Sequence, residues 1–316
     1  MMDCKIITGN ANIPLAKQIA IKLGINLTKA SIKHFSDREI QVKIIDNIRG
    51  SDCYIVQPTC YPAVNEYLME LLIIADALKR ASAMKITAII PYYGYGRQDR
   101  KSEPRVPITA RLIANLIATS GITRVITMDL HAGQIQGFFD IPVDHLRGKF
   151  VLAKYFKEKA LNNIVVVSPD AGGVERARSF AKSLNAELTI IDKRRPYPNE
   201  ATIMNIIGNV YNKTCIIVDD LIDTANTLTK VADAIKRKGA THVFATATHG
   251  VLSGDAIQKI QDSCIEELVI TDSIPLQINK HNKLYNKIVI LSVASLFAEA
   301  IIRIKRNESI SALFQE

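Results

Sequence analysis

The sequence lacks the features of a disulfide-stabilised, secreted or membrane-spanning protein. Its five cysteines are odd in number and include no Cys-x-x-Cys pair, which argues against a disulfide framework and a thiolate metal site. The most apolar helix expected, residues 67–78, contains Glu70 and Asp76, so no membrane span is predicted. Asp3 and Lys5 interrupt the N-terminus before any long apolar run, so no signal peptide is predicted. We therefore expect a protein of the reducing cytoplasm.

The positive charge of the chain is concentrated in two places. With 40 Lys and Arg against 31 Asp and Glu, the formal net charge is +9. Basic residues gather in the segments 97–105 and 193–195, and not along a helix face with interleaved aromatics as in a nucleic-acid-binding protein. These clusters favour a small polyanion as the ligand, and no nucleic-acid partner is expected.

Strands and helices are predicted to alternate along the whole chain. Short β-branched apolar runs such as Ile86–Ile90 are separated by segments of helical period, which predicts an α/β fold with parallel sheets. A length of 316 residues suits about two domains. Both halves contain an apolar strand that runs into an acidic loop, at Met128–Asp129 and Val218–Asp219. We expect two similar domains, 1–147 and 148–316, each a parallel sheet flanked by helices.

Residues 215–228, CIIVDDLIDTANTL, are the most informative stretch. Its first four residues predict a buried strand that stops at the acids, and a helical period begins at Thr227. A loop between a strand and a helix lies at the carboxyl end of the sheet and aims helix N–H groups at a ligand, which suits a phosphate. Asp219, Asp220 and Asp223 would repel an anion unless they face sugar hydroxyls or Mg²⁺. A sugar phosphate satisfies both demands.

The same stretch has an ordinary interpretation, in which Asp223 or Thr224 caps the helix and the acid pair is a solvated strand end. It contains two more acids than a cap needs, which favours the ligand site. The stretch also resembles the phosphoribosyl pyrophosphate loop of the type I phosphoribosyltransferase fold. It departs from that pattern at Asn226, where such loops usually carry Gly. Asn tolerates a left-handed backbone better than other residues with side chains, so the loop is expected to keep its shape.

Each of the remaining motifs, taken singly, also has an ordinary structural interpretation. Phe35 suits a core residue, His131 a loop histidine, 97–105 a charged surface and 168–173 a turn. In combination with residues 215–228 they make the chain similar to the ribose-phosphate pyrophosphokinase family over essentially its whole length. The reaction of that family moves the β,γ-diphosphoryl group of ATP to the anomeric oxygen of ribose 5-phosphate and releases AMP. A type I phosphoribosyltransferase-like fold is implied for both halves.

The resemblance implies a role for each group of residues. ATP binding is assigned to Phe35, Asp37, Glu39, Arg97 and Gln98, with Phe35 stacking on the adenine across a subunit interface. A Mg²⁺ ion beside the phosphates is assigned to His131 and Asp170. Catalysis is assigned to the basic residues Lys193 and Arg195. Ribose 5-phosphate is assigned to Asp219, Asp220, Asp223, Thr224, Ala225, Asn226 and Thr227.

The resemblance also extends to regulation and assembly. Residues that match parts of the effector site of phosphate-activated, ADP-inhibited family members are Arg49, Ser309, Ser311 and Phe314. The family forms hexamers built from dimers, so a homo-oligomer is expected. The small-molecule partners implied are ATP and ribose 5-phosphate as substrates, with inorganic phosphate and ADP as effectors.

Two other functions would use the same fold. A non-catalytic regulatory homologue would carry a damaged metal or basic loop, whereas His131, Asp170, Lys193 and Arg195 are all present. A phosphoribosyltransferase, which consumes the activated sugar, would not need the ATP motifs. An ordinary P-loop kinase is disfavoured because Gly94-Tyr-Gly96 is too short for a Walker loop.

Overall fold

The computed structural model describes residues 4–194, 203–276 and 285–314. The chain divides into two compact units, the first comprising Met1–Arg147, Ser273–Pro275 and Ser292–Glu316, and the second Gly148–Asp272 and Leu276–Leu291. The C-terminal segment thus belongs to the first unit, whereas the expected division into 1–147 and 148–316 assigned it to the second half. Among the described residues, no helix combines the length and the apolarity needed to cross a membrane.

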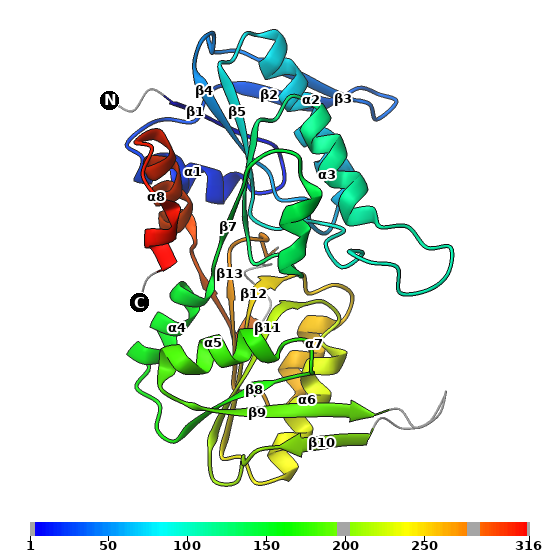
Figure 1. Ribbon diagram of the computed structural model, residues 1–316, viewed down its shortest axis with the longest axis vertical. Coiled ribbons are helices and arrows are strands. Elements are labelled where there is room, and N and C mark those ends of the chain that lie inside the picture. Colours follow the sequence, from blue (N-terminus) through cyan, green and yellow to red (C-terminus); the bar gives the residue numbers. More distant parts are fainter. Residues whose placement is uncertain (1–3, 195–202, 277–284, 315–316) are drawn as a thin grey trace. The chain divides into compact units, whose positions relative to one another are not determined.

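The first unit is built on a five-stranded parallel sheet (Figure 1). In spatial order its strands are β1 (Cys4–Thr8), β4 (Asp52–Val56), β5 (Lys85–Ile90), β6 (Arg124–Met128) and β7 (Val143–Leu146). These strands follow one another across the sheet in chain order. A separate antiparallel hairpin consists of β2 (Ala30–His34) and β3 (Ile40–Ile44), and its apolar residues pack against the same core as α2.

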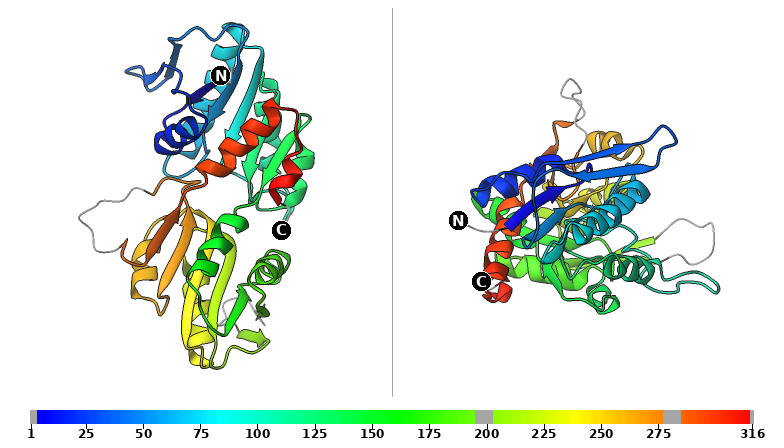
Figure 2. Two further views of the ribbon diagram at one scale, coloured as in Figure 1. Left: turned by 90° about the vertical axis from the view of Figure 1, so that its left-hand side faces the viewer. Right: turned by 90° about the horizontal axis from the view of Figure 1, so that it is seen from above.

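Helices cover both faces of this sheet. The core of one face includes α2 (Val64–Arg80) and α3 (Thr109–Thr119), and α1 (Ile13–Lys22) and α8 (Ala294–Lys305) lie side by side (Figures 1 and 2). Short 3₁₀ turns are η1 (Gly133–Phe138) and η3 (Ile310–Phe314). The side chain of Asn12 caps α1 by accepting the Leu15 N–H at 3.2 Å, as its position before Pro14 predicts.

Two polar contacts tie the C-terminal segment to the first unit. Lys305 Nζ lies 2.7 Å from Asp52 Oδ2 at the start of β4, and Ser292 Oγ donates to Gln18 Oε1 at 2.7 Å. Phe297 and Ile301 of α8 are fully buried, and burying such side chains contributes roughly 1.5–3 kcal/mol each. These long-range contacts explain why the segment departs from the sequence-based division.

The second unit contains a seven-stranded sheet that is parallel except at one edge. In spatial order its strands are β10 (Ile203–Ile207), β9 (Glu187–Arg194), β8 (Ile164–Ser168), β11 (Thr214–Ile222), β12 (His242–Gly250), β13 (Glu267–Thr271) and β14 (Ile288–Leu291). The antiparallel edge strand β10 was not predicted from the sequence.

Helices also cover the two faces of the second sheet. One face packs with α4 (Lys149–Glu158) and α5 (Val174–Leu184), and the other with α6 (Asn226–Arg237) and α7 (Ala256–Asp262) (Figure 1). Ile216 and Val218 face the first pair of helices, while Cys215 and Ile217 face the second. Burial on both faces explains why this strand is continuously apolar. The predicted α/β class, with parallel sheets flanked by helices, is confirmed.

Candidate active site

The strand order of the second unit reverses between β8 and β11. These two strands are neighbours, yet the chain continues from β8 to β9 on one side and from β11 to β12 on the other. In open α/β sheets such a reversal leaves a crevice at the carboxyl ends of the two strands, where ligands bind. The loops that follow β8 and β11 contain Asp170 and residues 223–225, so the topology brings two predicted site segments to one place.

Strand β11 extends beyond the end of β8. It pairs with β8 only as far as Ile217, but with β12 as far as Ile222. The expectation that the strand stops at the two acids was therefore wrong, because β12 continues to supply backbone partners. Asp219 and Asp220 lie past the last pair with β8, at the edge where the crevice is expected.

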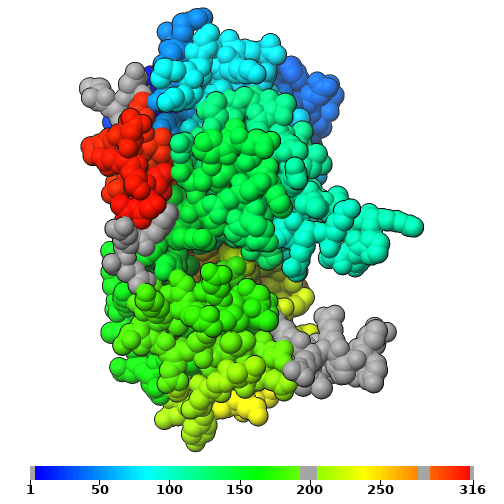
Figure 3. All heavy atoms as spheres, in the orientation of Figure 1, coloured from blue at the N-terminus to red at the C-terminus, as the bar shows by residue number. Residues whose placement is uncertain are grey.

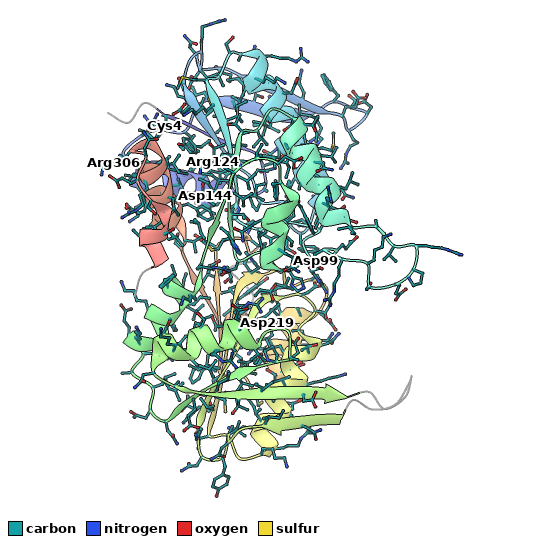
Figure 4. All side chains as sticks on the ribbon, in the orientation of Figure 1. Cys4, Asp99, Arg124, Asp144, Asp219 and Arg306 are labelled. Carbon is teal, nitrogen blue, oxygen red and sulfur yellow. The ribbon has the colours of Figure 1, made fainter. Side chains whose placement is uncertain are left out.

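An arginine that the sequence analysis missed joins the two acids. Arg176 Nη1, from the first turn of α5, lies 3.1 Å from Asp219 Oδ1 and 3.1 Å from Asp220 Oδ1. The Asp220 N–H also donates to Asp219 Oδ1 at 2.9 Å. Figure 4 labels Asp219, which lies within β11 three residues before its last residue, Ile222. The guanidinium offsets the repulsion between two adjacent carboxylates and fixes their orientation.

The acid pair remains electrostatically strained despite this arginine. The pKa of the Asp219 carboxyl is raised from 3.8 to about 7, chiefly by burial and also by the nearby Asp220 carboxylate, whereas Arg176 acts in the opposite direction. A carboxylate that is costly to ionise gains from sharing hydroxyl donors or a cation. The pair is thus suited to bind the hydroxyl groups of a sugar or a divalent metal ion.

The loop after β11 ends in a left-handed residue. Ala225 is the N-cap of α6 with φ of 59°, and no side chain of this residue caps the helix. Asn226 is already the first residue of the helix, so the left-handed backbone lies one residue before the position expected from the sequence. The alternative in which Asp223 or Thr224 is the N-cap is also wrong. An N-terminus without a side-chain cap suits an anionic ligand, because helix amides and the macrodipole both attract negative charge.

The loop after β8 converges on the same place. Asp170 is exposed; its Oδ1 accepts the Gly173 N–H at 2.9 Å, while Ser168 Oγ donates to the Asp170 carbonyl at 2.7 Å. A Cβ built on Gly173 would lie 3.1 Å from Ser168 Oγ and 3.6 Å from both Asp170 Oδ1 and Arg176 Nη1. These distances place the loop beside the arginine that joins the acid pair, and a side chain at position 173 would be in tight contact with Ser168 Oγ.

The backbone of Lys193 lies near the end of β9. The last pair between β8 and β9 joins Ser168 to Ile190, so β9 continues three residues past it before reaching Lys193. There β9 pairs with β10, Met204 being opposite Lys193. Arg195 lies outside the described residues. The predicted basic segment therefore begins inside β9, in the part of this strand that continues past its last pair with β8.

The predicted adenosine-binding residues Phe35, Asp37 and Glu39 lie in the first unit, in the turn of the β2–β3 hairpin. The turn is closed by the Phe35 N–H donating to the Glu39 carbonyl at 2.9 Å, and Asp37 Oδ1 accepts the Glu39 N–H at 3.1 Å. Phe35 is 49% exposed, so the alternative of a core residue is wrong. An exposed aromatic ring in a polar turn suits stacking on a planar ligand.

Three more predicted residues lie after strands of the first unit. Arg97 and Gln98 are exposed and follow β5, in a segment that stands out from the surface of the unit (Figure 3). Gln98 Oε1 accepts the Thr109 hydroxyl at 2.6 Å, which links the start of this segment to α3. His131 is exposed in the turn after β6. All three belong to the unit that also contains the hairpin.

The residues predicted to form an effector site also lie in the first unit. Arg49 follows β3, and its Nη1 donates to Ser82 Oγ at 3.2 Å. Ser309 and Ser311 lie at the C-terminal 3₁₀ turn, where the Ser311 N–H donates to Ser309 Oγ at 3.2 Å. Phe314 is the last residue of that turn. Several hydroxyl and amide donors are thus present around these positions.

Family models, related sequences and a solved structure all indicate the same family for this chain. A family model for the N-terminal domain of ribose phosphate pyrophosphokinase matches residues 4–121, and one for a phosphoribosyl synthetase-associated domain matches residues 193–315. A ribose-phosphate pyrophosphokinase of Bacillus caldolyticus is 57% identical over 99% of this chain and 100% of its own. That of Bacillus cereus is 56% identical over 99% of this chain and 97% of its own. The crystal structure of phosphoribosylpyrophosphate synthetase from Mycobacterium smegmatis is similar with a TM-score of 0.90 and 39% identity, covering 96% of this chain and 99% of that one.

Proposed function

The chain belongs to the ribose-phosphate pyrophosphokinase family, and from this membership we infer that it makes phosphoribosyl pyrophosphate from ATP and ribose 5-phosphate. The enzyme transfers the β,γ-diphosphoryl group of ATP to the 1-hydroxyl of the sugar and releases AMP, for use in nucleotide biosynthesis. The structural observation that carries this function best is the reversal of strand order between β8 and β11, with an acid pair and a helix N-terminus at the same edge.

Ribose 5-phosphate is the substrate that the β11–α6 loop suits. Its phosphate would be held by the N–H groups that begin α6, together with the hydroxyls of Thr224 and Thr227. Asp219 and Asp220 would accept hydrogen bonds from the ribose hydroxyls, and Asp223 would lie between the two groups. In this arrangement the carboxylates bind the ribose and the amides bind the phosphate, so the repulsion between aspartates and phosphate is reduced. Ala225 and Asn226 would contribute backbone amides.

The diphosphoryl group would lie toward the loop that follows β8. Positioning the 1-hydroxyl in line with the β-phosphorus and neutralising charge are the main requirements of phosphoryl transfer. Negative charge grows on the α-phosphate as AMP departs, and Lys193 and Arg195 are the proposed donors that stabilise it. The extension of β9 past the end of β8 supports this role for Lys193.

A magnesium ion is the proposed cofactor. Mg²⁺ binds hard oxygen donors and usually takes one or two carboxylates together with waters and substrate phosphates. The exposed carboxylate of Asp170 fits such a partial site, and His131 is the second proposed ligand, directly or through water. When bound, the ion would neutralise phosphate charge.

The nucleotide is proposed to bind through residues of the first unit. Phe35 would stack on the adenine, with Asp37, Glu39, Arg97 and Gln98 as polar contacts. The proposed assembly is a homohexamer in which the hairpin of one subunit reaches the nucleotide of its neighbour. Its exposed position in the hairpin leaves Phe35 accessible for that role.

Regulation by inorganic phosphate and ADP is proposed at Arg49, Ser309, Ser311 and Phe314. The arginine and the neighbouring hydroxyls match the donor chemistry that phosphate groups require. The proposed compartment is the cytoplasm, in keeping with five cysteines that are all free thiols.

Product analysis tests the proposed function. The purified protein is incubated with ATP, ribose 5-phosphate, Mg²⁺ and inorganic phosphate, and the nucleotide products are separated. AMP formed in step with a diphosphorylated ribose is expected. ADP would mean transfer of a single phosphoryl group, which contradicts the proposed mechanism. Absence of turnover under every effector condition would instead favour the non-catalytic regulatory homologue.

A further inference from the structure

The loop that follows β12 supports the β11–α6 loop from one side. Pairing between β11 and β12 continues to Ile222 opposite Gly250, and the Leu252 N–H then donates to the Ile222 carbonyl at 3.0 Å. One residue later, the Ser253 hydroxyl donates a hydrogen bond to Asp223 Oδ1. The loop therefore contacts the last strand residue before Asp223 and then Asp223 itself.

The backbone of this supporting loop is fixed by its conformation and packing. Leu252 has φ of 47°, a left-handed conformation that residues with a Cβ rarely adopt, and its side chain is only 5% exposed. A Cβ on Gly250 would come within 2.5 Å of Ile270 Cδ1, so the loop begins in close contact with β13. Gly254, with φ of 62°, follows Ser253. The serine hydroxyl is thus presented to Asp223 from a constrained turn.

Asp223 is the acid for which orientation matters most. It is half-buried and lies two residues before Ala225, the N-cap of α6. The amides that begin α6 attract any nearby carboxylate, which would then compete with a phosphate for the same donors. The Ser253 hydroxyl holds this carboxylate by a charge-assisted hydrogen bond.

We propose that Ser253 is a positioning residue for ribose 5-phosphate, because its hydroxyl holds the Asp223 carboxylate in place beside the phosphate-binding amides. This proposal rests on the proposed function, since it takes ribose 5-phosphate as the ligand of the loop. Ser253 acts through Asp223 and needs no contact with the substrate. Its effect is expected on the sugar phosphate, because Asp223 belongs to the loop proposed to bind that ligand.

Equilibrium binding of ribose 5-phosphate, measured by calorimetry on the full-length protein, tests this proposal. Ser253→Ala is expected to weaken binding about 10- to 100-fold, the usual range for a hydrogen bond to a charged group. Ser253→Thr keeps the hydroxyl and is expected to retain most of the affinity. Ser183→Ala is the matched control, because that hydroxyl donates to the Ser179 carbonyl of its own helix at 3.2 Å in the same unit. Thermal unfolding of each variant identifies losses caused by poor folding.

A double-mutant cycle separates positioning from general structural support. In an Asp223→Ala background, Ser253→Ala is expected to add no further loss of ribose 5-phosphate affinity, because the hydroxyl has no carboxylate left to hold. Equal losses in both backgrounds, or unchanged binding by Ser253→Ala, would overturn the proposal. A wild-type protein that does not bind ribose 5-phosphate would overturn it too. Binding without AMP production would contradict the proposed function while leaving the test of Ser253 valid.

Discussion

The carboxyl edges of the two parallel sheets differ in what occupies them. In the first unit, the fully buried Glu70 accepts the Asn10 N–H at 2.9 Å, Asn10 Nδ2 at 2.5 Å and Gln57 Nε2 at 2.7 Å, at the ends of β1 and β4. A Cβ on Gly9 would lie 2.4 Å from Gln57 Oε1, which shows how closely these groups pack. In the second unit, the corresponding edge presents a carboxylate with a raised pKa.

Topology explains the difference between the two edges. The strands of the first sheet follow one another in chain order, whereas those of the second reverse direction between β8 and β11. A reversal separates the two loops at a sheet edge and leaves space for a ligand, while a one-directional order lets consecutive connections fill the edge. Similar parallel sheets can thus differ in use because their strand order differs and because their buried acids have different hydrogen-bond partners.

The largest expected effect comes from removing the cation of the second edge. Arg176→Met leaves Asp219 and Asp220 adjacent without their shared partner, so kcat/KM for ribose 5-phosphate is expected to fall on the order of 10²-fold or more, as loss of two charge-assisted hydrogen bonds implies. Steady-state kinetics at varied ribose 5-phosphate provide the measurement. Arg178→Met, an exposed change on the same helix, is the control. Equal losses in both variants would show that α5, and not the guanidinium, is responsible.

A smaller effect, on stability and not on turnover, is expected at the first edge. Glu70→Gln replaces a carboxylate oxygen by an amide group that faces donors, so the free energy of unfolding is expected to fall by about 1–3 kcal/mol. Urea denaturation measures this change. Asp76→Asn on the same helix, half-exposed and paired with Arg80, is expected to cost less than about 1 kcal/mol. A selective loss of catalytic rate in Glu70→Gln, with stability unchanged, would mean that the buried Glu70 cluster acts in catalysis and not only in packing.

The raised pKa of Asp219 predicts a pH-dependent difference between the wild type and Asp219→Asn. Between the unfolded pKa near 3.8 and the folded pKa of about 7, the folded state holds a proton that the unfolded state has released. The stability contributed by this group is therefore fully present below the lower value and is lost as the pH rises through the upper one. Melting temperatures without metal or substrate are expected to decline more from pH 5 to about pH 8 in the wild type than in Asp219→Asn.

Asp255→Asn is a control of opposite sign for this pH series. A hydrogen bond from Lys259 lowers the pKa of the Asp255 carboxyl, so its contribution is lost as the pH falls. This group is fully exposed, and solvent screening keeps its effect small. Melting temperatures that change with pH in the same way in the wild type and in Asp219→Asn would contradict the raised pKa of Asp219.

Local patterns in the sequence were enough to predict much of the fold and the main loop of the site. The apolar run from Cys215 and the acids after it predicted a strand that leads into a ligand loop. Long-range pairing was not predictable in the same way. Strand β11 continues to Ile222 only because β12 lies beside it, and the C-terminal segment joins the first unit through contacts such as Lys305 with Asp52.

The hydrogen-bond partners of the site residues could not be predicted from the sequence patterns either. Arg176 lies 43 positions before Asp219, and Ser253 lies 30 after Asp223. Neither separation matches a helical or strand period, because each contact depends on which strands are neighbours in the sheet. One local feature does indicate Arg176 as a site residue. It lies in the first turn of the helix that follows Ser168–Gly173, and that helix begins beside the predicted ligand loop.

The smallest expected effect concerns the left-handed residue at the start of α6. Ala225→Gly removes the cost of a Cβ at φ of 59°, offset in part by the greater freedom of glycine in the unfolded chain, so a gain of about 0.5–1 kcal/mol in stability is expected. Asn226→Gly, which introduces the residue usual in the loops that this stretch resembles, is expected to lose a few tenths of a kcal/mol because position 226 is helical. Urea midpoints distinguish the two variants. The opposite order would place the strained backbone at Asn226, as the sequence pattern alone had suggested.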